Sequence, residues 1–93
     1  MNQTAALLDI HQLAATIQAG TRFRFHPADP HDMPSPEYLL TATESPHTCP
    51  EGLCVPFAYP PEFTARHDFE TGQFCSGLAD NADRFEIVEA NRG

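Results

Sequence analysis

The sequence predicts an α+β domain in which one N-terminal amphipathic helix packs on a four- to five-stranded, mainly antiparallel sheet. Three observations predict it: an apolar stripe with helical spacing near the N-terminus, later segments in which apolar and polar residues alternate, and a long proline-rich irregular segment in the middle. A chain of 93 residues with 41% hydrophobic content forms a single domain, residues 1–93, with a thin core.

The helix is expected over about residues 4–19. Thr4 is the expected N-cap, and Gly20 fits the left-handed position that ends many helices. Apolar residues recur at spacings of three and four, namely Leu7, Ile10, Leu13 or Ala14, and Ile17. This stripe is expected to cover one face of the sheet.

Five strands are expected, over about residues 21–26, 37–43, 67–70, 73–76 and 84–89. Phe23 and Phe25 alternate with charged residues, which is the period of a half-buried strand, and Phe85 and Ile87 repeat that pattern. Thr71-Gly72 is the expected hairpin turn between the third and fourth strands. If the first and last strands are neighbours, the arginines of the first strand, Arg22 and Arg24, can pair with Glu86 of the last.

Proline makes two further segments irregular. Residues 27–36 contain four prolines and form a loop, because proline cannot donate a hydrogen bond to a neighbouring strand. Residues 44–61 are also expected to be irregular, with no more than a short strand at residues 55–59. One helical turn is expected in residues 61–66.

The charge balance is acidic, with thirteen Asp and Glu against five arginines, no lysine and a formal charge of −8. Residues 26–65 contain no Lys or Arg and hold six acids: Asp29, Asp32, Glu37, Glu44, Glu51 and Glu62. Such a surface repels nucleic acid and anionic membranes, and it attracts basic protein surfaces. We therefore expect neither direct nucleic-acid binding nor membrane binding.

The cellular compartment of the protein is predicted from features that the sequence lacks. No run of 18 apolar residues is present, and the first ten residues lack the basic segment of a signal peptide. The three cysteines are an odd number, so we expect a cytoplasmic chain with reduced thiols. The chain is expected to be a monomer or a small homo-oligomer.

A histidine and three cysteines are the strongest candidate ligands. His47, Cys49 and Cys54 lie within eight residues, and Cys75 is a potential fourth ligand. Three interpretations are open: thiols packed as small apolar groups in a rigid turn, a Cys3His zinc site, or a disulfide between the two nearer cysteines. The first is preferred, because structural zinc usually uses two closely spaced pairs. The histidines and aspartates of residues 26–32 are interpreted as a solvated loop.

No catalytic residue is predicted. The chain has no G-x-S-x-G motif, phosphate-binding glycine loop or H-E-x-x-H motif. A thiolate nucleophile requires an electropositive setting, and the acidic composition opposes it. We therefore expect a non-enzymatic protein.

The leading hypothesis is a binding protein that docks a negative patch onto a basic protein surface, such as that of a nucleic-acid-binding complex. The six acids of residues 26–65 would supply charge, and three aromatic residues would supply buried contact: Tyr38, Phe57 and Tyr59. Duplex DNA carries about 19 charges over a domain's width of roughly 32 Å, more than twice the net charge of −8 of this chain. A one-sided acidic patch is therefore favoured over mimicry of a whole duplex.

The short, acidic, lysine-free profile resembles in kind that of small inhibitors encoded by viruses and mobile elements, including anti-CRISPR and anti-restriction proteins. The resemblance covers no motif and implies no residue roles. This hypothesis requires no cofactor. The alternative is a small interaction module stabilised by one structural zinc, held by His47, Cys49, Cys54 and Cys75.

Overall fold

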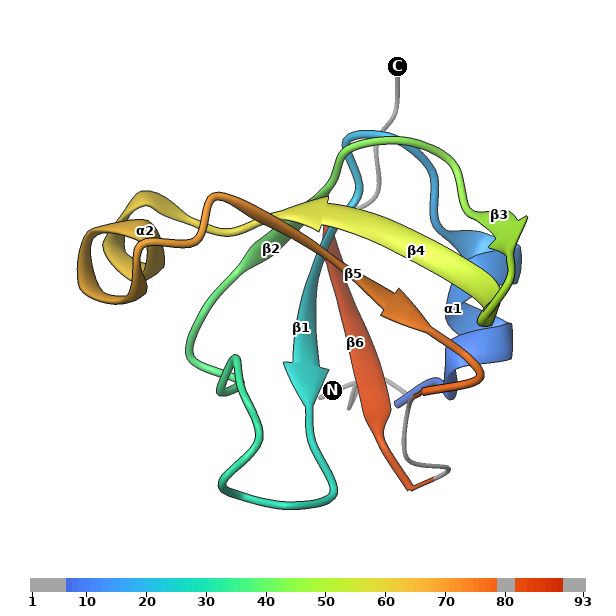
Figure 1. Ribbon diagram of the computed structural model, residues 1–93, viewed down its shortest axis with the longest axis horizontal. Helices are drawn as coiled ribbons and strands as arrows, with labels where there is room; N and C mark the ends of the chain where they lie inside the picture. Colours follow the sequence, from blue (N-terminus) through green and yellow to red (C-terminus); the bar gives the residue numbers. More distant parts are fainter. Residues whose placement is uncertain (1–6, 79–81, 90–93) are drawn as a thin grey trace, which may run out of the picture.

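The computed structural model describes residues 7–78 and 82–89. In that part of the chain it contains two helices and one six-stranded antiparallel sheet (Figure 1). The helices are α1 (Ile10–Thr16) and α2 (Pro61–His67), and the strands are β1 (Arg22–His26), β2 (Leu40–Ala42), β3 (His47–Cys49), β4 (Gly52–Ala58), β5 (Thr71–Cys75) and β6 (Arg84–Glu89). The predicted α+β class and antiparallel pairing are confirmed, with one strand more than expected.

The sheet has the strand order β3-β4-β2-β1-β6, and β5 pairs with the other edge of β4. The first and last strands, β1 and β6, are neighbours. In Figure 1 the pair β4 and β5 crosses over the pair β1 and β6. The two pairs pack face to face, because the ring of Phe74 in β5 lies 4.7 Å from that of Phe25 and 5.0 Å from that of Phe85.

Between these layers lies an aromatic core that α1 closes. Phe23, Phe57 and Phe85 are almost completely buried. Leu13 of α1 is fully buried and belongs to the same cluster. Burying each such side chain contributes about 1.5–3 kcal/mol, which makes these residues the main source of stability in a domain of this size.

The first helix is shorter than predicted and begins later. Asp9 is its N-cap: the Gln12 amide donates to the Asp9 carboxylate at 2.8 Å, and the Asp9 amide donates to the Gln12 side chain at 2.9 Å. The predicted cap, Thr4, lies outside the described residues. Leu8 is extended and bridges to Phe85, and Leu7 is exposed rather than part of the apolar stripe. The prediction of a helix over residues 4–19 is therefore wrong for residues 7–9 and 17–19, which are not helical.

Residues 44–61, predicted to be irregular apart from a short strand at residues 55–59, contain β3 and the longest described strand, β4, which overlaps that short strand and begins earlier. Pro56 is tolerated in β4 because it lies where one edge of that strand changes partner, from β3 to β2. The Thr43 amide donates to the Pro56 carbonyl at 3.2 Å, and the reciprocal bond cannot form because proline has no N–H. The proline therefore leaves this part of the sheet with one hydrogen bond fewer.

The hairpin predicted around Thr71-Gly72 is also wrong. Residues 67–70 are not a strand, because α2 continues to His67 and ends at Asp68, whose φ of 66° is left-handed. Thr71 and Gly72 lie inside β5, opposite Ala58 and Phe57 of β4. The predicted strand over residues 37–43 is reduced to the three residues of β2.

Candidate functional site

The acids of the lysine-free stretch are all exposed: Asp29, Asp32, Glu37, Glu44, Glu51 and Glu62. Glu44 lies 3.6 Å from the Nδ1 atom of His47. Within residues 7–78 and 82–89, the other five lie within ion-pair distance of no arginine or histidine. Their charge is therefore directed to solvent.

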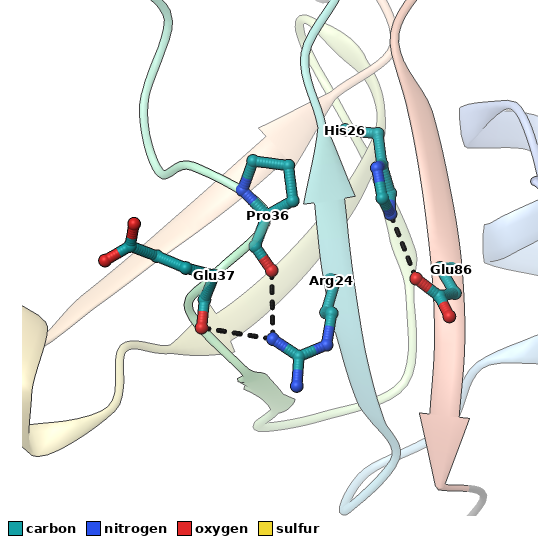
Figure 2. Close-up of polar contacts among 5 residues, drawn as sticks. All are labelled: Arg24, His26, Pro36, Glu37 and Glu86. Carbon is teal, nitrogen blue, oxygen red and sulfur yellow. Dashed lines mark hydrogen bonds and ion pairs between the residues drawn. The ribbon is translucent and has the colours of Figure 1, made fainter.

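Arg24 shows why Glu37 stays unpaired although a guanidinium lies nearby. Its Nη1 atom donates to two main-chain carbonyls, of Pro36 at 2.9 Å and of Glu37 at 3.1 Å, and Figure 2 shows the Glu37 carboxylate pointing away from it. The predicted pairing of Arg24 with Glu86 is wrong, because the Glu86 carboxylate contacts His26 Nε2 at 3.0 Å (Figure 2). Arg24 thus fixes the loop before β2 through its backbone and leaves the carboxylate free.

Four of the acids lie on adjoining segments, and we call them the acidic face: Asp29, Asp32 and Glu37 in the loop between β1 and β2, and Glu62 in the first turn of α2. The loop is held to α2 by Tyr38, whose ring lies 5.0 Å from that of Phe63 and whose hydroxyl accepts a hydrogen bond from Arg66 at 3.3 Å.

The sequence predicted one patch of six acids, but only these four belong to it, because Glu44 and Glu51 lie elsewhere on the molecule. Glu44 follows β2, at the end of that strand away from the loop. Glu51 lies at the tip of the β3–β4 hairpin, at the opposite end of β4 from α2 (Figure 1).

Two of the three predicted contact aromatics lie in the protein interior. Tyr38 is 6% exposed and Phe57 is 2% exposed, so neither presents a ring to a partner, and the prediction is wrong for both. Tyr59 is partly buried and stacks on Phe63 with ring centroids 4.1 Å apart. Burial raises the pKa of Tyr59, because the interior disfavours the phenolate. Tyr59 alone retains a surface that a partner can reach.

A groove of about 270 Å³ lies beside the acidic face and was not predicted from the sequence. Asp32, Met33 and Leu78 lie at its lining, and the last two are exposed by 51% and 74%. Phe74 and Cys75 also line it. Because these residues come from two stretches far apart in the sequence, residues 32–33 and 74–78, no local pattern in the sequence signals the groove.

The cysteines are gathered as the zinc interpretation requires, but two of them are joined. Cys49 and Cys54 form a disulfide, which corrects the preferred interpretation of free thiols in a turn. Cys75 is a buried free thiol whose Sγ atom lies 3.1 Å from that of Cys54. The three Sγ atoms all lie within 4.8 Å of one another, and they are the one such group of metal-capable side chains in the described part of the chain.

His47 occupies the position opposite Cys54 in the β3–β4 pairing, so both side chains belong to the same face of the sheet. Its ring lies beside Glu44 rather than with the sulfurs. Burial, and then the charge of Glu51, raise the pKa of the Cys75 thiol. A protonated thiol is a poor nucleophile, so this setting does not favour catalysis by Cys75.

Comparison with protein-family models, curated proteins and solved structures finds no match for this chain. Within the described residues, no helix is long and apolar enough to cross a membrane. Any function must therefore be argued from the acidic face, the groove and the cysteine cluster themselves.

Proposed function

We propose that this chain is a non-enzymatic binding protein that docks its acidic face onto a basic protein surface, such as that of a nucleic-acid-binding complex. One observation carries the proposal: Asp29, Asp32, Glu37 and Glu62 are exposed, and no described arginine or histidine neutralises them. Their field extends into solvent, where it accelerates encounter with a cationic partner.

The groove gives such a partner a point of attachment. A lysine or arginine side chain has an apolar stem and a charged head, and the groove offers the matching surfaces. Met33 and Leu78 provide apolar contact for the stem, and Asp32 provides a carboxylate for the head. The contact restricts the partner's orientation, which charge alone does not do.

Docking on a cationic site would exclude nucleic acid from it, since both ligands require the same arginines and lysines. In kind, the protein would act like an anti-CRISPR or anti-restriction inhibitor. The second candidate, a zinc-stabilised module, is favoured by the three clustered sulfurs.

The test uses two double variants that change the net charge equally. Asp32→Lys/Glu37→Lys alters the acidic face, and Glu44→Lys/Glu51→Lys alters acids outside it. The partner is captured from host extract with the wild-type protein, identified and purified, and association rates are measured for all three proteins. At low ionic strength we expect the acidic-face variant to associate at least about 10-fold more slowly, and the control less than about 3-fold.

Salt and competition complete the test. Raising the ionic strength should slow association of the wild type, because exposed charges are screened beyond about 8 Å at physiological salt. The wild type should also displace a fluorescent duplex from the captured protein. Equal rates for the two variants, or a duplex that stays bound at saturating protein, would refute the proposal.

A further inference from the structure

Four metal-capable residues occupy adjacent positions at one corner of the sheet. His47 of β3 pairs with Cys54 of β4, which pairs in turn with Cys75 of β5, so the three form a row across three strands. Cys49 is two residues beyond His47 on β3 and therefore lies on the same face. No other three strands of the described sheet bring such residues together.

Strand pairing explains why the sulfurs meet. The Ser76 amide donates to the Leu53 carbonyl at 2.9 Å, which makes the neighbouring Cys54–Cys75 pair the non-hydrogen-bonded kind, in which side chains approach most closely. The tight turn of the β3–β4 hairpin brings Cys49 to the same point, with its Cα atom 6.3 Å from that of Cys54. Strand pairing and the hairpin turn thus bring all three cysteines to one corner of the sheet.

We propose that Cys49, Cys54 and Cys75, in their reduced state, bind one thiophilic divalent ion of the Zn²⁺ class, with His47 as the fourth ligand. Tetrahedral zinc with Zn–S bonds of about 2.3 Å requires sulfurs about 3.8 Å apart. The Cys54 and Cys75 sulfurs are 3.1 Å apart, and all three lie within 4.8 Å, so small side-chain rotations reach this geometry.

His47 is assigned the fourth position because a Cys3His set is a common structural zinc site and because it shares the row. Its side chain is 46% exposed and its Nδ1 atom lies 3.6 Å from the carboxylate of the exposed Glu44, so a change of rotamer costs little. Glu51 is the competitor, since its carboxylate lies 3.9 Å from the Cys49 sulfur. Its charge would favour a cation at this corner whether or not it binds the metal directly.

The reaction balances with one external reductant of the dithiol class. The dithiol donates two electrons and two protons to the Cys49–Cys54 bond, that bond breaks into two thiols, and the dithiol closes to its own disulfide. Zn²⁺ then forms three Zn–S bonds as three thiol protons leave to solvent, and neutral His47 binds through a lone pair. The disulfide and the metal are thus alternative links at one corner.

The ion would join three neighbouring strands, β3, β4 and β5. Cys49 is partly exposed and Cys75 lines the groove, so an ion can reach the cluster although Cys54 and Cys75 are buried. The corner lies at the opposite end of β4 from α2 (Figure 1), and metal binding there requires none of the four acids of the acidic face, so this site goes beyond the proposed docking and either can fail without the other.

Cobalt provides the direct test, because Co²⁺ bound by thiolates in a tetrahedron absorbs strongly in the near ultraviolet and the visible. The full chain is reduced with dithiothreitol, freed of the reductant without oxygen, and titrated with Co²⁺ and then Zn²⁺. We expect one Co²⁺ per chain, displaced by Zn²⁺, in the reduced protein. The oxidised protein should show one free thiol when unfolded in denaturant and no tetrahedral spectrum when folded.

Variants assign the ligands. Cys75→Ser and His47→Ala should each weaken Co²⁺ binding by at least about 10-fold, whereas His31→Ala, an exposed histidine in the β1–β2 loop, should leave it unchanged. Native mass spectrometry of the wild type should show a zinc adduct lighter by the displaced protons, and this measurement needs no folded variant.

Two results would overturn the proposal. Reduced wild-type protein with no tetrahedral cobalt spectrum and no zinc adduct would exclude the site. Weakened binding in Glu51→Gln with unchanged binding in His47→Ala would remove His47 as the fourth ligand in favour of the carboxylate.

Discussion

Tyr59 connects the core to the acidic face through its ring. It stacks on Phe63 of α2 and makes an edge contact with Phe57 of β4, with ring centroids 4.1 and 4.9 Å apart. It follows β4 directly, and its amide donates to the Glu70 carbonyl at 2.9 Å. One residue thereby positions α2, which carries Glu62.

This burial predicts a specific loss of stability at alkaline pH. Burial raises the pKa of Tyr59 above its ordinary value of 10.0. Above that pH the unfolded chain loses the phenol proton while the folded chain keeps it, so the free energy of unfolding falls as pH rises through the folded pKa. The decline is at most about 1.4 kcal/mol per pH unit for one group.

Tyr59→Phe removes this titration and keeps the ring. Urea unfolding at about pH 8 and about pH 10.5 should show that wild type loses more stability than the variant over that interval. Equal losses in the two proteins would mean that the phenol titrates alike in the folded and unfolded chains.

At the scale of elements, the β3–β4 hairpin depends on Gly52. Its φ of 105° is in the region that disfavours residues with a Cβ atom. A Cβ atom there would also lie 2.3 Å from the Ser76 hydroxyl, which accepts a hydrogen bond from the Leu53 amide. The glycine thus allows the hairpin to close against the end of β5, where the cysteines meet.

Gly52→Ala should therefore reduce the free energy of unfolding by about 1–3 kcal/mol. Pro50→Ala, in the same turn, is the control and should cost less than about 1 kcal/mol, through the entropy of the unfolded chain. Both are measured by chemical unfolding under oxidising conditions. A Gly52→Ala protein as stable as the control would show that the turn does not require this conformation.

Elements whose local pattern agreed with their environment were predicted well. β1 and β6 alternate phenylalanine or isoleucine with charged residues, and both strands form as expected. β4 was predicted only in part, as a short strand at residues 55–59, because Gly52 and Pro56 both disfavour a strand. Long-range pairing with three neighbours outweighs that local preference. The N-terminal boundary of α1 was predictable, since Asp9 and Gln12 have the spacing of a capping box.

The candidate site was predictable only where it is local in sequence. The exposure of the acids followed from composition, and the spacing of Cys49 and Cys54 indicated a common site. The disulfide between them could not be predicted from the sequence, because their spacing is equally compatible with a disulfide, a metal site or free thiols. Met33 and Leu78 both line the groove but are far apart in the sequence, so only the tertiary structure brings them to one site.

At the scale of the whole molecule, eight net negative charges are confined to a domain with a radius of gyration of 12.6 Å. Like charges at this density repel one another and oppose the compact state. The acids of the acidic face, which no described cation neutralises, contribute to this repulsion. Under our proposal, docking requires these same charges, so binding and stability make opposite demands on them.

Asp32→Lys/Glu37→Lys should therefore raise the melting temperature while it weakens docking. Relief of repulsion worth a few tenths to 1 kcal/mol corresponds to a rise of about 2–5 °C for a domain of this size. The rise should be present in low-salt buffer and nearly absent at about 0.5 M NaCl, where the Debye length is only about 4 Å. Thermal melts followed by circular dichroism at both salt concentrations measure it. A melting temperature that falls at low salt would show that these carboxylates stabilise the fold, and that their exposure is structural rather than kept for a cationic partner.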